Sequence, residues 1–174
     1  GIPLNDAESH GVYWVNMPDF ASSTDNIQIQ RGVGTSTNGA AAFGSSINIK
    51  TDNIQKDATT SVDNSFGSFN TIKNNIKVGT GIINNKFSFD ARVSRIQSDG
   101  YVDRASSNLN SMYLSGAWIG KKTLIKANLF RGHERTYQAW WGVNDEQLKN
   151  NRTFNYYTYE NEVDNYNQDH YQLH

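Results

Sequence analysis

Histidine is the residue type here that most readily binds a metal or transfers a proton, and the 174 residues include four of them. His170 and His174 are four positions apart, so on a helix they would share a face and could bind a metal ion together. The surrounding YNQDHYQLH alternates as a strand does, which would separate the two by about 13 Å. Asp169 beside His170 forms a dyad, but the sequence places no nucleophile next to it. Surface positions are therefore the simpler interpretation for these two, and for His10 and His133.

A glycine-rich segment, RGVGTSTNGAAAFGSSINIKT (31–51), could in principle bind phosphate through its backbone amides. A Walker loop needs Gly-Lys-Ser/Thr, and no lysine follows Gly39. The dinucleotide fingerprint needs a third glycine where this chain has Thr37. The chain also has no cysteine, which excludes a thiol nucleophile, a zinc–thiolate site and disulfides. We therefore predict a protein that is not an enzyme and uses no cofactor or metal.

Charge and hydropathy exclude further classes. With 16 basic and 17 acidic residues the net charge is −1, and no basic run suggests nucleic acid. No apolar run approaches the roughly 20 residues of a membrane helix, and we expect no signal peptide within these residues. The chain opens on GIPLND without a methionine, so we expect a fragment of a longer protein.

Alternating hydrophobicity from about residue 59 onward predicts half-buried β-strands. The opposite positions on these strands are polar or charged, among them Lys73, Lys77, Arg92 and Lys126. The positions that share the apolar side fall into four runs: Ile72, Ile76, Val78 and Ile82; Phe87, Phe89, Ala91 and Val93; Met112, Leu114, Gly116 and Trp118; and Ile125, Ala127 and Leu129.

The connections between these strands differ at the two ends. Asn84–Asn85 and Gly120–Lys121 predict tight turns, because these residues tolerate positive φ. Longer polar loops are expected at residues 98–108 and from His133 to about Asn167. Short turns at one end and long loops at the other are typical of outer-membrane barrels. A soluble β-sandwich alternates in the same way, so periodicity alone leaves both folds open.

The segment after the fifth strand is rich in aromatic residues. Tyrosine and tryptophan combine a large apolar ring with a polar O–H or N–H group, and together with arginine they are typical of binding surfaces. The rings could equally pack on one another or form the interfacial girdle of a barrel. The residues concerned are Arg135, Tyr137, Trp140, Trp141, Arg152, Phe154, Tyr156, Tyr157 and Tyr159.

The glycine-rich segment also contains a series of short motifs in a fixed order. Arg31-Gly32 after NIQIQ, then Asn38-Gly39, Ala42-Phe43-Gly44 and INIKT, resembles the end of the plug domain of TonB-dependent outer-membrane receptors. The opening GIPLND and the later GSFNT, SDGYVDR and LFRGHERTYQAWWGV extend the resemblance over essentially the whole chain, and it looks closest to receptors of Bacteroidetes type. Two departures are Ser45-Ser46 in place of a second glycine and Asn38 in place of an aromatic residue. Asparagine also tolerates a left-handed backbone.

The resemblance implies a mainly β fold in two parts. Residues 1–55 would be the C-terminal half of a plug domain, and residues 56–174 about six antiparallel strands of a transmembrane β-barrel. A plugged transporter barrel has about 22 strands, so this chain would be a piece of one. The implied location is the bacterial outer membrane.

The resemblance also implies partners and residue roles. The parent receptor would bind an extracellular ligand, a ferric siderophore or else haem, cobalamin or an oligosaccharide, and import it to the periplasm with TonB, whose contact segment this chain lacks. Outer-membrane lipid would surround the strands. Arg31 would be held by barrel glutamates, Gly32, Gly34, Gly39 and Gly44 would allow close plug packing, and Tyr13, Trp14, Arg135, Tyr137, Trp140 and Trp141 would contact ligand. The alternative is a secreted β-rich module that binds glycans through its aromatic loop.

Overall fold

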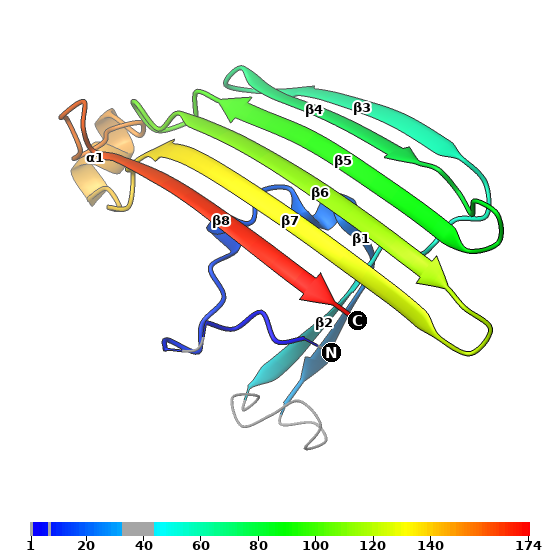
Figure 1. Cartoon of the computed structure of the whole chain (residues 1–174). Helices are drawn as coiled ribbons and strands as arrows, with labels where there is room; N and C mark the ends of the chain where they lie inside the picture. The colour runs from blue at the N-terminus through cyan, green and yellow to red at the C-terminus, as the bar shows by residue number, and fades with distance from the viewer. Residues whose placement is uncertain (1, 7, 33–43) are drawn as a thin grey trace.

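The fold is mainly β and consists of two separate antiparallel sheets (Figure 1). It was obtained as a computed structural model, which describes residues 2–6, 8–32 and 44–174. The smaller sheet pairs β1 (Thr24–Arg31) with β2 (Ser45–Thr51). The larger sheet has six strands in chain order: β3 (Thr59–Gly67), β4 (Thr71–Gly79), β5 (Phe87–Ser98), β6 (Ser107–Ile119), β7 (Leu124–Tyr137) and β8 (Val163–Leu173).

Three short helical segments accompany the strands. The 3₁₀ turns η1 (Trp14–Asn16) and η2 (Phe20–Ser23) precede β1, and α1 (Asp145–Asn150) lies between β7 and β8. A capping box starts α1, in which the Asn144 side chain accepts a hydrogen bond from the backbone of Gln147 and the Gln147 side chain accepts one in return. Within the described part of the chain, no helix is long and apolar enough to cross a membrane.

The two ends of the six-stranded sheet differ in part as the sequence predicts, since the β3–β4 turn at the end with the long loops is short, residues 68–70. Asn84 and Asn85 adopt φ values of 50° and 54° in the tight connection before β5. The turn between β6 and β7 closes with a hydrogen bond of 2.7 Å from the amide of Gly120 to the carbonyl of Thr123. The longer connections 99–106 and 138–162, the second containing α1, lie together at the opposite end (Figure 1).

The predicted bounds of the second long loop and the predicted end of one strand are wrong. Strand β7 continues to Tyr137 and β8 begins at Val163, so the segment His133–Tyr137 is strand and the second long loop is 138–162. Strand β4 ends at Gly79, and Ile82 lies in the connection, because Gly81 turns the chain with a φ of +66°. The first error arises because the side chains that would continue the apolar positions of β7, His133 and Arg135, are polar, so the alternation is hidden there.

The two faces of the larger sheet have opposite chemistry. We call the face that contacts the described residues of the N-terminal segment (2–6, 8–32 and 44–58) the covered face; it carries mostly polar and small side chains. The opposite side, the open face, carries apolar side chains that are largely exposed. Those exposed by two fifths or more include Val62, Ile76, Val78, Phe89, Val93, Leu114, Trp118, Ile125, Tyr171 and Leu173. A soluble sandwich buries its apolar face, so this sheet has the reverse arrangement.

The buried apolar core is small and lies on the covered face. Met17 packs with Tyr113 and Phe130, and Leu4, Val12 and Phe20 pack around them. The rings of Phe20 and Phe130 meet edge to face at 5.0 Å. Gly132 allows η1 to approach closely, since a Cβ there would lie 2.4 Å from the carbonyl oxygen of Asn16. This core seats the N-terminal segment on β6 and β7.

Candidate functional site

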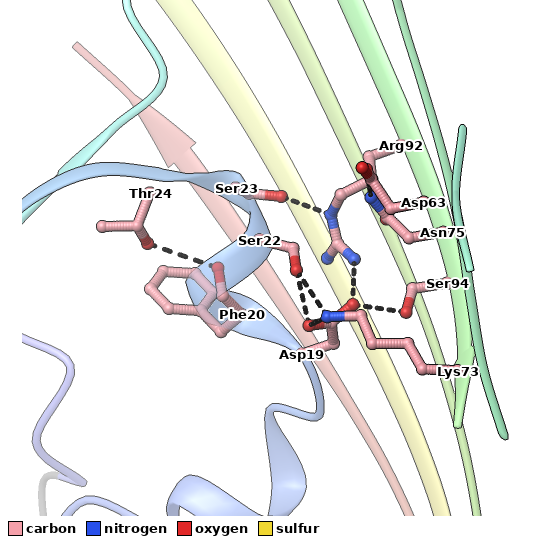
Figure 2. Close-up of polar contacts among 10 residues, drawn as sticks. All are labelled: Asp19, Phe20, Ser22, Ser23, Thr24, Asp63, Lys73, Asn75, Arg92 and Ser94. Carbon is pink, nitrogen blue, oxygen red and sulfur yellow. Dashed lines mark hydrogen bonds and ion pairs between the residues drawn. The ribbon is translucent and has the colours of Figure 1, made fainter. Parts of the chain in front are cut away.

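The most highly connected polar group of the described residues is the carboxylate of Asp19, the residue at the N-cap position of η2 (Figure 2). Asp19 has a left-handed backbone, with φ 54° and ψ 26°, a conformation that aspartate tolerates better than most side chains. Its oxygen Oδ1 accepts a hydrogen bond of 2.6 Å from the hydroxyl of Ser22 in the turn that follows. The turn therefore fixes the carboxylate in place, directed at the covered face.

Two cations from neighbouring strands meet this carboxylate. Lys73 of β4 donates from Nζ to Oδ1 at 2.5 Å, and Arg92 of β5 donates from Nη1 to Oδ2 at 3.2 Å. The hydroxyl of Ser94, also on β5, donates to Oδ2 as well. Figure 2 shows these groups converging on Asp19 from the sheet. One carboxylate thus bridges two strands and the N-terminal segment.

Arg92 is the most deeply placed charge of the cluster, with 1% of its surface exposed. Its Nε donates a hydrogen bond of 2.6 Å to the hydroxyl of Ser23, which is itself completely buried. Among the described residues its Nη2 has no hydrogen-bond partner. A buried guanidinium without an opposite charge costs several kcal/mol, so the ion pair with Asp19 is needed for this arrangement.

The environment of Asp19 also sets its protonation state. Burial raises the pKa of this carboxyl, but the hydrogen bonds from Lys73, Ser22 and Ser94 outweigh burial and hold the pKa below its ordinary value of 3.8. Asp19 is consequently ionised at neutral pH. Because the carboxylate faces two cations, the cluster is an electrostatic attachment that acid would weaken.

A second polar contact lies where β2 leads into the larger sheet. Lys126 of β7 donates from Nζ to the carbonyl of Asp52 at 2.8 Å and to the hydroxyl of Thr51 at 3.2 Å. The carboxylate of Asp52 forms an ion pair with Lys77 of β4, with 2.6 Å between nitrogen and oxygen. Acidic groups of the N-terminal segment thus meet cations of the covered face at two separate points.

The loops at the far end of the sheet hold one another. Arg104 in the 99–106 connection donates to the carbonyls of Asn155 and Tyr157. The buried amide of Asn155 donates in turn to the carbonyls of Asp103 and Gln138. These hydrogen bonds make the two loops one structural unit.

The aromatic residues of the second loop divide into two groups. Phe154 and Tyr156 stack edge to face at 4.9 Å, and the hydroxyl of the buried Tyr137 donates to the carbonyl of Tyr159. Trp140 and Trp141 remain 73% and 68% exposed. The first group of rings therefore packs within the loop, while the two tryptophans remain exposed and available for contact with another molecule.

The structure brings together only some of the residues predicted to bind ligand. Tyr13 and Trp14 are 54% and 47% exposed at η1, on the N-terminal segment. Within the described ranges no ring contact joins them to Trp140 or Trp141. Arg135 is exposed on β7. Their role in ligand contact stays a prediction.

The glycine-rich segment is described only at its ends. Gly32, with a φ of +84°, donates its amide to the carbonyl of Gly44 at 2.7 Å, which closes the β1–β2 ladder. Arg31 is exposed at the end of β1, and none of the ion pairs found among the described residues includes it. The predicted latch of Arg31 therefore stays a prediction, and Gly34 and Gly39 lie outside the described residues.

The histidines provide no metal site in the described part of the chain, where no group of three or more His, Cys, Asp or Glu side chains gathers. His170 lies in β8 against the ring of Phe130, with the centroids 6.4 Å apart, and His133 shares a hydrogen bond with Asn165. His174 lies just past the end of β8.

The cluster around Asp19 was not predicted from the sequence. One partial signal for it was available: Lys73, Lys77, Arg92 and Lys126 all occupy polar positions of β4, β5 and β7, which indicates a polar face but does not identify Asp19 as a partner. Comparison with protein-family models and with curated proteins finds no match for this chain.

Proposed function

We propose that this chain is a segment of a TonB-dependent receptor of the bacterial outer membrane. In this proposal residues 1–55 are the C-terminal half of the plug and residues 56–174 the first barrel strands. The parent protein would bind an extracellular nutrient, a ferric siderophore or a related ligand, and import it to the periplasm. No covalent chemistry is required of the chain, because TonB would supply the work.

The observation that supports this proposal most strongly is the chemistry of the two sheet faces. Phe89, Val93 and Leu114 are exposed by 40% or more, while Arg92 and Ser88, on the same strand as Phe89, are buried at 1%. An apolar face of this size is costly in water. Barrels in membranes have this arrangement, with apolar residues toward lipid and polar residues toward the lumen.

The order of the strands supports the same conclusion. The six strands form a meander in which each pairs with the next, as barrel strands do. Strands β3 and β8 form the edges of the sheet, each with one hydrogen-bonded neighbour. Further strands of the parent protein would pair with these edges and close the barrel, which would remove the exposed edges.

The attachment of the N-terminal segment fits a plug that must be released. The segment is held by charged and hydroxyl groups at Asp19 and Asp52 and by a small apolar core around Met17. Polar contacts can be exchanged for water when the segment moves, whereas a large apolar interface could not be separated so easily. We propose that the Asp19 cluster is one of the contacts that yield when TonB pulls.

The tryptophans allow a direct test of this assignment. A variant that keeps only Trp118 (Trp14→Phe, Trp140→Phe, Trp141→Phe) is compared with one that keeps only Trp140 (Trp14→Phe, Trp118→Phe, Trp141→Phe). Both are reconstituted in phosphatidylcholine vesicles with brominated acyl chains. We expect brominated lipid to quench Trp118 strongly, and aqueous iodide to quench Trp140.

The competing candidate is a secreted glycan-binding module that uses the exposed pair Trp140 and Trp141. It predicts a chain that is monomeric without detergent and a Trp118 that brominated lipid does not quench. Either result would remove the basis for a barrel.

A further inference from the structure

Along the strands, the open face of the sheet changes from rows of apolar side chains to rows that also contain charged and polar side chains. The register aligns Ala91, Leu114, Leu129 and Tyr171 in one row, and Phe89, Gly116, Ala127 and Leu173 in the row nearer the short turns. In the other direction, toward the long loops, two mixed rows follow. They contain Val93, Met112, Arg131 and Asp169, and then Arg95, Asn110, His133 and Asn167.

Two hollows on the open face follow this division. The first, of about 700 Å³, lies over the apolar rows, with Phe89, Leu114 and Leu129 in its wall. The small residues Gly116 and Ala127 form part of its lining, and a Cβ at Gly116 would already touch the ring of Phe89 at 3.4 Å. The second, of about 400 Å³, is lined by Ile76, Val93 and Met112 together with Arg95, Arg131 and His133.

The second hollow has a net positive charge. Arg131 forms a bidentate pair with Asp169, with hydrogen bonds of 2.7 and 2.8 Å. Arg95 is exposed, and among the described residues its guanidinium has neither an ion pair nor a hydrogen bond. Arg135 lies one row further toward the loops on the same face. Asp169 is thus outnumbered by cations in this region.

We propose that these two hollows together bind a membrane lipid with a phosphate-bearing, anionic headgroup. An acyl chain of the lipid lies along the apolar rows, and its phosphate meets Arg95 and Arg131, with His133 beside them. The inference rests on the proposed function, because it takes the open face to be in lipid and the long loops to be outside. It adds that the protein binds one class of lipid selectively, from the leaflet on the side of the long loops.

The chemistry of the site favours phosphate over other headgroups. Arginine side chains extend along apolar surface and place their guanidinium at the interface, where phosphate is the available anion. Guanidinium and phosphate form charge-assisted, bidentate hydrogen bonds. A zwitterionic lipid offers the same phosphate with a neighbouring cation that cancels its attraction. The site should therefore prefer a net anionic lipid.

The test uses a single tryptophan beside the apolar hollow, introduced as Tyr171→Trp in a chain whose four native tryptophans are replaced by phenylalanine. The protein is reconstituted in phosphatidylcholine with a minor fraction of phosphatidic acid. Quenching is compared when either lipid carries the bromine atoms. We expect phosphatidic acid to be enriched beside the reporter, and Arg95→Gln to lower this enrichment about fivefold, the effect of removing one interfacial cation.

Matched variants separate this effect from a loss of folding. Arg95→Lys should keep the enrichment, and Lys122→Gln, in the turn at the opposite end of the sheet, should leave it unchanged. Quenching in proportion to the mole fractions of the two lipids in the unmodified background, or equal losses for Arg95→Gln and Lys122→Gln, would overturn the proposal while leaving the barrel intact. If neither lipid quenches the reporter, the face is covered by protein, such as a second copy of the chain, and the proposed function fails with it.

Discussion

At the residue scale, Asp19 is the group on which the attachment of the N-terminal segment depends. Its side chain is 7% exposed and faces the ammonium of Lys73 and the guanidinium of Arg92, whose side chain is fully buried. Without its carboxylate both cations would remain in a poorly solvated site. Removing one partner of a buried ion pair is costly because of the charge that is left behind.

Asp19→Asn should therefore lower the free energy of unfolding by about 3 kcal/mol. The measurement is chemical unfolding in detergent, followed by tryptophan fluorescence. The matched control is Asp25→Asn, because Asp25 pairs with Lys50 at 3.8 Å on an exposed surface and should contribute about 0.5 kcal/mol or less. Equal effects of the two substitutions would show that the cluster around Asp19 does not hold the segment.

The same carboxylate predicts a dependence on pH. Its pKa is lower in the folded chain than its ordinary value of 3.8, so the folded state binds fewer protons there than the unfolded state. The stabilisation is complete above the ordinary pKa and is lost as the pH falls toward the depressed one. The difference in unfolding free energy between the unmodified chain and Asp19→Asn should be constant near neutrality and shrink below about pH 4. A difference that grew with acidification would contradict this assignment.

At the element scale, the sequence predicts the strands better than it predicts their contacts. Period-2 alternation fixes which side chains share a face, and the residues at Asn84–Asn85 and Gly120 fix the tight turns. Periodicity carries no information on partners that are distant in the chain. Asp19 is 54 residues from Lys73 and 73 from Arg92. That contact depends on where η2 lies against the sheet, which no local pattern specifies.

The misplaced start of the second loop has a related cause. Residues His133–Tyr137 continue β7, but the outward positions His133 and Arg135 are polar, so the apolar alternation ends before the strand does. In the proposed barrel these residues would extend the strand beyond the lipid. Hydrophobic periodicity marks the extent of the apolar band and not the extent of the strand.

The close packing of η1 on β7 predicts that a side chain at Gly132 would displace η1. Gly132→Val would place a side chain where the Asn16 carbonyl and the Pro18 ring now lie, at 2.4 and 2.7 Å from an ideal Cβ. We expect η1 to move off the sheet at a cost of about 2 kcal/mol, with faster hydrogen exchange at residues 12–23. Gly142→Ala is the control, because a Cβ there meets nothing within 4 Å. Unchanged exchange in Gly132→Val would contradict the close packing of η1 on β7.

At the scale of the whole molecule, the chain combines a polar, occupied face with an apolar, exposed one. The polar face binds the N-terminal segment through Asp19 and Asp52, and the apolar face is the proposed lipid contact. The long loops gather at one end of the sheet, tied together by Arg104 and Asn155, with Trp140 and Trp141 exposed there. The proposed function assigns attachment, membrane contact and recognition to three different surfaces.

The most direct test of this account is a scan of the environment along β5. Because the chain has no cysteine, single cysteines can be placed at each position from Ser88 to Val93 and spin-labelled in vesicles. The account predicts that accessibility to oxygen alternates, high at Phe89, Ala91 and Val93 and low at Ser88, Asp90 and Arg92. Uniform accessibility, or an alternation of the opposite phase, would contradict it.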